Sequence, residues 1–214
     1  PPNTGNVIRL AANTGCELEF NSGNLFYEAG NRALEENDLD RALTAYNDAL
    51  AINPQHTGAL YNRSVVWSRK GNLDQALADV NACLELDPAD VMALFSRAIT
   101  WLHKQEYHKA IADCNEVLRL APDHRKVHNE RGAAWAKLGD HEQARRDFEE
   151  VVRRNADSPK PHLYANLALT CARLGDLQQA VDYQTKAVEL APAEELEKYR
   201  AELQELTAYL LARE

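Results

Sequence analysis

TGALYNRSVVWSRKGNLDQALADVNACLELDPAD, residues 57–90, is followed directly by VMALFSRAITWLHKQEYHKAIADCNEVLRLAPDH, residues 91–124. Both stretches have tryptophan, alanine and proline at the same places, so the sequence repeats every 34 residues. The same spacing extends outward in both directions, apart from a final step that is two residues longer. The matching residues are Trp67, Trp101 and Trp135; Ala42, Ala76, Ala110, Ala144 and Ala180; and Pro54, Pro88, Pro122 and Pro192. A fixed period of this length indicates an array of small, similar units.

Placing the regular prolines at position 32 divides residues 23–194 into five repeats. The repeats are 23–56, 57–90, 91–124, 125–158 and 161–194, with Pro159 and Lys160 as an insertion. Each repeat has the pattern of two amphipathic helices joined by a tight turn. Position 8 is small and position 20 is always alanine, which allows two helix backbones to approach closely. Gly71, Gly139 and Gly175 lie in the turns, where glycine ends a helix in the left-handed conformation. The pattern therefore predicts one helical hairpin per repeat.

These residues resemble the tetratricopeptide repeat, which has an aromatic residue near position 4, small residues at 8 and 27, aromatic residues at 11 and 24, alanine at 20 and proline at 32. The resemblance covers residues 23–194. It implies an all-α fold, a right-handed α-solenoid of five helix-turn-helix repeats, in which the first helices line one concave face.

Arginine and aspartate occur together in the middle three repeats and are both missing from the outer two. Arginine stands at position 7 and aspartate at position 23 of the same repeat. We therefore expect ion pairs that bridge the two helices of one repeat. The expected pairs are Arg63–Asp79, Arg97–Asp113 and Arg131–Asp147.

The two ends differ from the repeats. Within residues 195–214 an apolar stripe with helical spacing predicts a capping helix, because a stack of repeats needs a terminal helix with a polar outer face. A coiled-coil dimer seam is the alternative for this stripe. Residues 1–22 are expected to form a short non-helical, extended segment. Two short strands are predicted there, at Val7–Leu10 and Cys16–Phe20. Such a hairpin would need to pack on the first repeat or on a partner, or be left over from a removed domain.

Composition excludes several classes of protein. The chain has 214 residues and a formal net charge of -9, and an acidic balance argues against a nucleic-acid partner. No stretch of eighteen apolar residues is present, so membrane insertion is not expected. Four cysteines without a CxxC motif favour a reducing compartment, and the expected location is the cytoplasm. A periplasmic or exported protein, after removal of a signal, is the alternative.

Motifs of catalysis are missing from the sequence, which contains no GxSxG, P-loop, HExxH or glycine-rich dinucleotide turn. Cys83, Cys114 and Cys171 fall at helix-packing positions and are expected to be small buried residues. His124 and His128 are spaced as metal ligands on a helix, but His124 falls in a connecting loop. We therefore expect no enzyme, no cofactor and no metal site.

Function is expected on the first helices. The family resemblance implies that positions 2, 5, 6, 9, 12 and 13 bind a peptide or a partner's helix. The expected partner-binding residues are Tyr27, Asn31, Tyr61, Asn62, Arg69, Met92, Phe95, His103, Lys126, Asn129, Lys137, Asn166 and Arg173. The first three repeats offer aromatic and apolar side chains at these positions, whereas the last two offer cations. A ligand with an apolar segment and an acidic end, the latter toward the last two repeats, would fit this gradient.

One branch of the family grips the acidic C-terminus of heat-shock chaperones with a clamp of lysine, arginine and asparagine side chains. Asn31 and Asn62 match the two asparagines, but the cationic places hold Tyr27, Met92 and Ser96. Without those cations the charge-assisted bonds to a terminal carboxylate are lost, so this clamp is not expected.

The sequence therefore predicts a non-catalytic protein-interaction scaffold that binds a peptide or protein segment in its groove. The first alternative is a homo-oligomeric scaffold that assembles through one of its ends. The second alternative, a metal-dependent or catalytic protein, would require a site around His124 and His128.

Overall fold

The computed structural model describes residues 14–212, with side chains from residue 23 onward. All regular structure in this part of the chain is helical. The helices are α2 (Thr14–Glu35), α3 (Leu39–Ile52), α4 (Thr57–Arg69), α5 (Leu73–Leu86), α6 (Val91–His103), α7 (Tyr107–Leu120), α8 (Val127–Leu138), α9 (His141–Arg154), α10 (Pro161–Leu174), α11 (Leu177–Leu190) and α12 (Leu196–Leu211). Each of the five repeat intervals contains two helices, and α12 follows the last repeat. The all-α prediction is confirmed.

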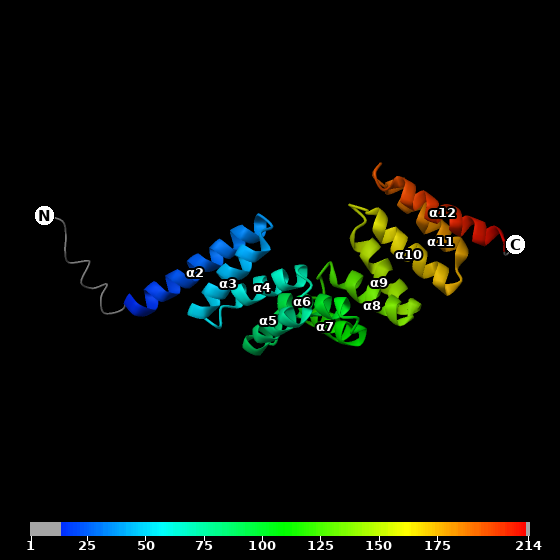
Figure 1. Ribbon diagram of the computed structural model, residues 1–214. Coiled ribbons are helices and arrows are strands. Elements are labelled where there is room, and N and C mark those ends of the chain that lie inside the picture. The colour runs from blue at the N-terminus through cyan, green and yellow to red at the C-terminus, as the bar shows by residue number, and fades with distance from the viewer. Residues whose placement is uncertain (1–13, 213–214) are drawn as a thin grey trace. The chain divides into compact units, whose positions relative to one another are not determined.

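The helices form two compact units that divide between Lys104 and Gln105, in the turn of the third repeat. In the first unit, α2 pairs with α3 and α4 with α5, and α5 also packs against α6. In the second unit, α8 pairs with α9 and α10 with α11, while α7 packs against α8 and α12 against α11 (Figure 1). Within each unit the second helix of a repeat therefore packs against the first helix of the next.

Turns between the paired helices follow the glycine prediction. Gly71, Gly139 and Gly175 have φ values of 78°, 84° and 84°, in the left-handed region that glycine adopts without steric cost. The first and third repeats have no glycine in this turn. Asn37 and Gln105 take the left-handed conformation there, with φ values of 58° and 62°.

Small side chains lie where the paired helices come closest. The alanine at position 20 is fully buried in every repeat, at Ala42, Ala76, Ala110, Ala144 and Ala180. The position 8 residues are buried as well, including Gly30 against Tyr46 and Gly132 against Phe148. Close packing at these positions is the reason that the repeat tolerates only small residues there.

Arginine at position 7 joins both helices of its own repeat. Arg63 donates from Nε and Nη2 to the Asp79 carboxylate at 2.8 and 2.6 Å. Arg131 makes the same two bonds to Asp147, at 2.9 and 2.7 Å. Both predicted ion pairs are confirmed. Arg97 and Asp113 belong to different units, and their pairing stays a prediction.

The same arginines also reach back to the preceding repeat, which the sequence analysis did not foresee. Each donates from Nη1 to an asparagine at position 25. The bonds are Arg63 to Asn47 at 2.7 Å, Arg97 to Asn81 at 3.0 Å and Arg131 to Asn115 at 2.6 Å. One side chain therefore ties consecutive repeats together.

The prediction for residues 1–22 is wrong in its second half. Helix α2 begins at Thr14, so Cys16–Phe20 is helical and not a strand. A helix propagates at lower cost than it nucleates, whereas a short strand needs a partner for its backbone groups. The predicted strand Val7–Leu10 lies outside the described residues.

The capping helix is present. Helix α12 places Tyr199 against α11, where only 3% of its surface stays exposed. Buried Gln184 on α11 donates from Nε2 to the Tyr199 carbonyl at 3.1 Å and to Glu202 at 2.9 Å. No helix among the described residues combines the length and the apolar character that crossing a membrane requires.

Candidate functional site

Helix α10 is the centre of a set of cavities in the second unit. His162, Asn166, Leu169 and Arg173 follow one another at helical spacing and share one face of α10. Each of these residues lines a cavity, either between α8 and α10 or between α10 and α12. The first helices of repeats four and five and the capping helix therefore border a common hollowed surface.

The first cavity, called the Lys137 cavity, has a volume of about 290 Å³ and lies between the C-terminal halves of α8 and α10. Lys137 and Arg173 supply its charges, and its described lining contains no carboxylate. Leu169 contributes an apolar wall and is 60% exposed. The ring nitrogen Nδ1 of His141 is buried without a hydrogen-bond partner among the described residues. The cavity therefore combines two cations, an apolar wall and one unsatisfied polar atom.

The second cavity, called the Lys126 cavity, has a volume of about 340 Å³ and lies at the N-terminal ends of α8 and α10. Three exposed cations, Arg125, Lys126 and Lys160, line it together with one carboxylate, Glu130. The amide of Asn129 donates to Glu130 at 3.2 Å. Its oxygen Oδ1 is buried without a partner among the described residues. This cavity is also cationic.

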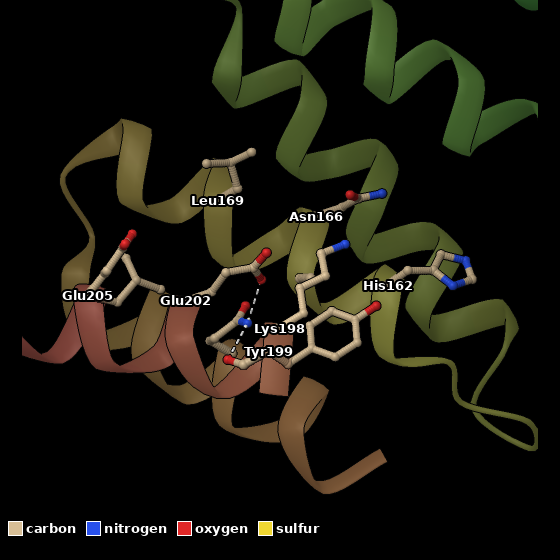
Figure 2. Close-up of a pocket in the computed structure, with 10 residues that line it drawn as sticks. His162, Asn166, Leu169, Lys198, Tyr199, Glu202 and Glu205 are labelled. Atoms are coloured by element: carbon tan, nitrogen blue, oxygen red, sulfur yellow. Dashed lines mark hydrogen bonds between the residues drawn. The ribbon is translucent and has the colours of Figure 1, made fainter. Parts of the chain in front are cut away.

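The third cavity, called the capping-helix cavity, has a volume of about 350 Å³ and lies between α10 and α12. Figure 2 shows Lys198 extending from α12 toward Asn166 of α10, with Glu202 beside it. The Lys198 ammonium lies 5.4 Å from the centre of the Tyr199 ring. Burial raises the pKa of the Tyr199 hydroxyl. Asn166 and Leu169 line both this cavity and the Lys137 cavity, so the two are adjacent.

Pockets for small molecules have volumes of about 300–1,000 Å³. The three cavities lie at the small end of this range, so each suits an individual side chain of a ligand. The structure thus brings five of the predicted residues to one surface. They are Lys126, Asn129, Lys137, Asn166 and Arg173.

Three other predicted residues form a hydrogen-bonded network in the first unit. Asn62 donates to Asn31 Oδ1 at 2.8 Å and to the Tyr27 hydroxyl at 3.4 Å. The Tyr46 hydroxyl also donates to Asn31 Oδ1, at 2.9 Å, and burial raises its pKa to about 12. Tyr27 lies 4.7 Å from the ring of His56, measured between ring centres. These contacts join the first two repeats and already use part of the polar capacity that a ligand would need.

The remaining predicted residues of the first unit differ in exposure. Met92 is 51% exposed, and Arg69 and His103 are exposed as well. Tyr61 is half-buried, and desolvation raises the pKa of its hydroxyl, with a smaller contribution from Asp90. Phe95 is only 8% exposed, so its prediction as a surface aromatic is wrong.

His128, one of the two residues of the metal alternative, lies beside an ion pair. His128 Nδ1 lies 3.0 Å from the Asp147 carboxylate that also accepts from Arg131. Among the described residues, no group of three or more histidine, cysteine, aspartate or glutamate side chains is arranged to hold a metal ion. Cys83, Cys114 and Cys171 are buried as predicted. Burial raises the pKa of Cys83 to about 11 and that of Cys114 to about 12.

Family comparison agrees with the repeat pattern and the helical hairpins. Two models described as tetratricopeptide repeat match residues 29–99 and residues 130–195. The chain belongs to the tetratricopeptide repeat (TPR) family. Comparison with curated protein sequences gave no match.

Solved structures of other TPR proteins have the same fold. MamA from Desulfovibrio magneticus RS-1 is 19% identical with a TM-score of 0.74, over 79% of this chain and 94% of that one. TTC0263, a thermophilic TPR protein of Thermus thermophilus, is 20% identical with a TM-score of 0.64, over 87% and 99%. YrrB, described as a TPR protein with an unusual peptide-binding site, is 18% identical with a TM-score of 0.68, over 83% and 91%. Identity at this level supports the fold alone.

Sequence reasoning missed the contribution of the capping helix. Residues 195–214 were interpreted only through their apolar stripe, although Lys198, Glu202 and Glu205 share the side of α12 that faces α10. The signal was available, because these three residues are spaced four and three apart and so lie on one helix face.

Proposed function

We propose that this TPR protein is a non-catalytic scaffold that binds a peptide segment of a partner protein along α8, α10 and α12 of its second unit. TPR proteins serve as protein-interaction scaffolds, and stacked repeats offer extended binding surfaces. One observation carries the proposal. The described cations of this surface form no salt bridges, although most other arginines of the second unit do. The cations concerned are Arg125, Lys126, Lys137, Lys160 and Arg173.

An acidic peptide accounts for these cations. Each exposed ammonium or guanidinium group retains its hydration until a carboxylate approaches, and a partly enclosed cavity strengthens the resulting attraction. The exposed side chain of Leu169 offers apolar contact between the cationic cavities and the capping helix. The ligand is therefore expected to carry acidic residues next to an apolar one.

The test is selection of a random peptide library, displayed on phage, against the wild-type chain. Selected peptides are then synthesised with a fluorescent label, and their affinities are measured by anisotropy. Lys137→Glu combined with Arg173→Glu should weaken binding about tenfold or more, because two attractive charges become repulsive.

The matched control is Arg119→Glu combined with Arg146→Glu, which makes the same change in net charge on positions of α7 and α9 outside the cavities. This control should bind the selected peptides like the wild type. Equal affinity of the wild type and the Lys137/Arg173 variant would contradict the proposed function.

Self-assembly is the second candidate function. Apolar side chains are exposed on the first and last described helices, including Leu25 at 67% and Leu211 at 64%. An association through such side chains should raise the apparent mass with concentration. Light scattering over a wide concentration range measures this, and a constant monomer mass would exclude it.

A further inference from the structure

The hollowed surface bordered by α8, α10 and α12 is called the groove of the second unit. Its charges change sign from one side of α10 to the other. Lys137 and Arg173 lie on the α8 side, whereas Glu202 and Glu205 of α12 lie on the opposite side. Figure 2 shows Glu202 and Glu205 beside the cavity, with Leu169 across from them on α10. The acidic side was not predicted from the sequence, which placed only cations in the last repeats.

The two carboxylates have no cationic partner in the described part of the chain. Glu202 accepts one hydrogen bond from the buried Gln184 amide at 2.9 Å, and neither glutamate forms a salt bridge there. Lys198 belongs to the same cavity, yet its ammonium lies 5.4 Å from the Tyr199 ring centre and makes no ion pair with Glu202 among the described residues. Glu202 and Glu205 are thus placed to receive a cation from outside.

The width of α10 sets a minimum distance between the two charged sides of the groove. An α-helix with its side chains is about 10–12 Å in diameter, and an extended peptide advances about 3.3 Å per residue. A peptide that crosses α10 from one charged side to the other therefore advances at least about three residues. Leu169, 60% exposed and shared by both cavities, lies between the two charged sides.

We infer, building on the proposed function, that this groove selects peptides in which an acidic and a basic residue stand at one fixed spacing, three or more positions apart. The acidic residue binds at Lys137 and Arg173, and the basic residue binds at Glu202 and Glu205. An apolar residue between them packs on Leu169. The capping helix is then a specificity element as well as a terminal cover.

The phage-displayed random library described above tests this inference. Peptides selected by the wild-type chain should share an acidic and a basic residue at one fixed spacing and in one order. Glu202→Gln combined with Glu205→Gln removes both charges, while the glutamine at 202 still accepts from Gln184. Peptides selected by this variant should keep the acidic residue and lose the basic one. Glu189→Gln combined with Glu194→Gln, at exposed positions outside the cavities, is the matched control and should select like the wild type.

Affinities of purified peptides provide the quantitative readout. Replacing the basic residue of a selected peptide with alanine should weaken binding to the wild type by about threefold to tenfold, and should have no effect on the Glu202/Glu205 variant. Equal losses on both proteins, or selected peptides without a basic residue at fixed spacing, would overturn the inference. If such peptides still lose affinity to Lys137→Glu with Arg173→Glu, the proposed function stands. If none does, both fail.

Discussion

Gly30 lies where the two helices of the first repeat approach each other closely. A Cβ atom at this position would meet the Tyr46 ring at 2.5 Å. We predict that Gly30→Ala lowers the free energy of unfolding by about 1–3 kcal/mol, because the ring must move in a packed core. Urea unfolding followed by circular dichroism measures the change.

Gly23, on the same helix α2, is the matched control. A Cβ atom there would find its nearest neighbour, an Ile52 methyl group, at 3.4 Å, which is an ordinary contact. Gly23→Ala should raise the free energy of unfolding by up to about 1 kcal/mol, since alanine is the better helix former. A loss of stability in both variants would show that helix approach is not what distinguishes the two sites.

Glu150 predicts a pH dependence. Arg153 donates to both of its carboxylate oxygens and Arg154 to one, and these bonds, with Arg153 the larger cause, lower the pKa of Glu150 to about 2. A lowered pKa in the folded state stabilises the protein above the ordinary glutamate pKa, and this contribution is lost as the pH falls toward 2. Glu150→Gln should therefore be less stable than the wild type at pH 7, and the difference should shrink below about pH 4.5. Thermal unfolding across this range measures it, and a difference independent of pH would contradict the assignment.

Two of the three expected ion pairs within a repeat are confirmed. The Arg63–Asp79 and Arg131–Asp147 pairs could be predicted because both residues appear and disappear together. The bonds from these arginines to the preceding repeat were missed, although asparagine occupies position 25 of the first three repeats. Phe95 was placed on the surface because helical spacing gives a face but not how deeply a neighbour covers it.

At the scale of elements, α12 is held by few buried groups. Tyr199 is the residue of α12 that is buried, and Gln184 supplies the buried polar contact from α11. Tyr199→Ala should lower the free energy of unfolding by about 3 kcal/mol and release α12 from α11. Hydrogen exchange should then speed up across α12 more than across α8. Leu211→Ala, at a side chain 64% exposed on the same helix, is the control and should leave exchange unchanged. Slow exchange of α12 in the Tyr199 variant would mean that other contacts hold the helix.

Elements inside the repeats were predictable because a strict period constrains every hairpin at once. The segment before the first repeat had no such constraint. Alternation of apolar and polar residues over Cys16–Phe20 fits a strand locally, but it is too short to decide against extension of an adjoining helix.

For the whole molecule, net charge and local charge have opposite signs. The chain carries -9, whereas the Lys126 and Lys137 cavities carry an excess of cations. We predict that binding of an acidic selected peptide slows as salt is raised, because local cations act within a Debye length of about 10 Å at 0.1 M salt. Stopped-flow fluorescence at increasing sodium chloride measures the rate. A rate that rises with salt would mean that the overall negative charge governs the encounter.

The candidate site was predictable in part. Family spacing led to Lys126, Lys137 and Arg173, because a TPR groove is built from known positions of the first helices. The carboxylates of α12 fall outside the repeats, so no repeat position assigned them a role. The structure shows their contribution, because α12 packs against α11 and borders a cavity together with α10.

The hydrogen bond from the position 7 arginine to the asparagine of the preceding repeat gives the second repeat a matching contact on each of its two sides. Arg63 fits the asparagine of the repeat before it, and Asn81 fits the arginine of the repeat after it. Lys70 and Asp74 behave likewise, pairing with Asp40 before and Lys104 after. A tandem duplication of residues 57–90 would therefore regenerate each of these hydrogen bonds and salt bridges on both sides of the inserted repeat. The second repeat can therefore be inserted again without new complementary substitutions at these four polar positions.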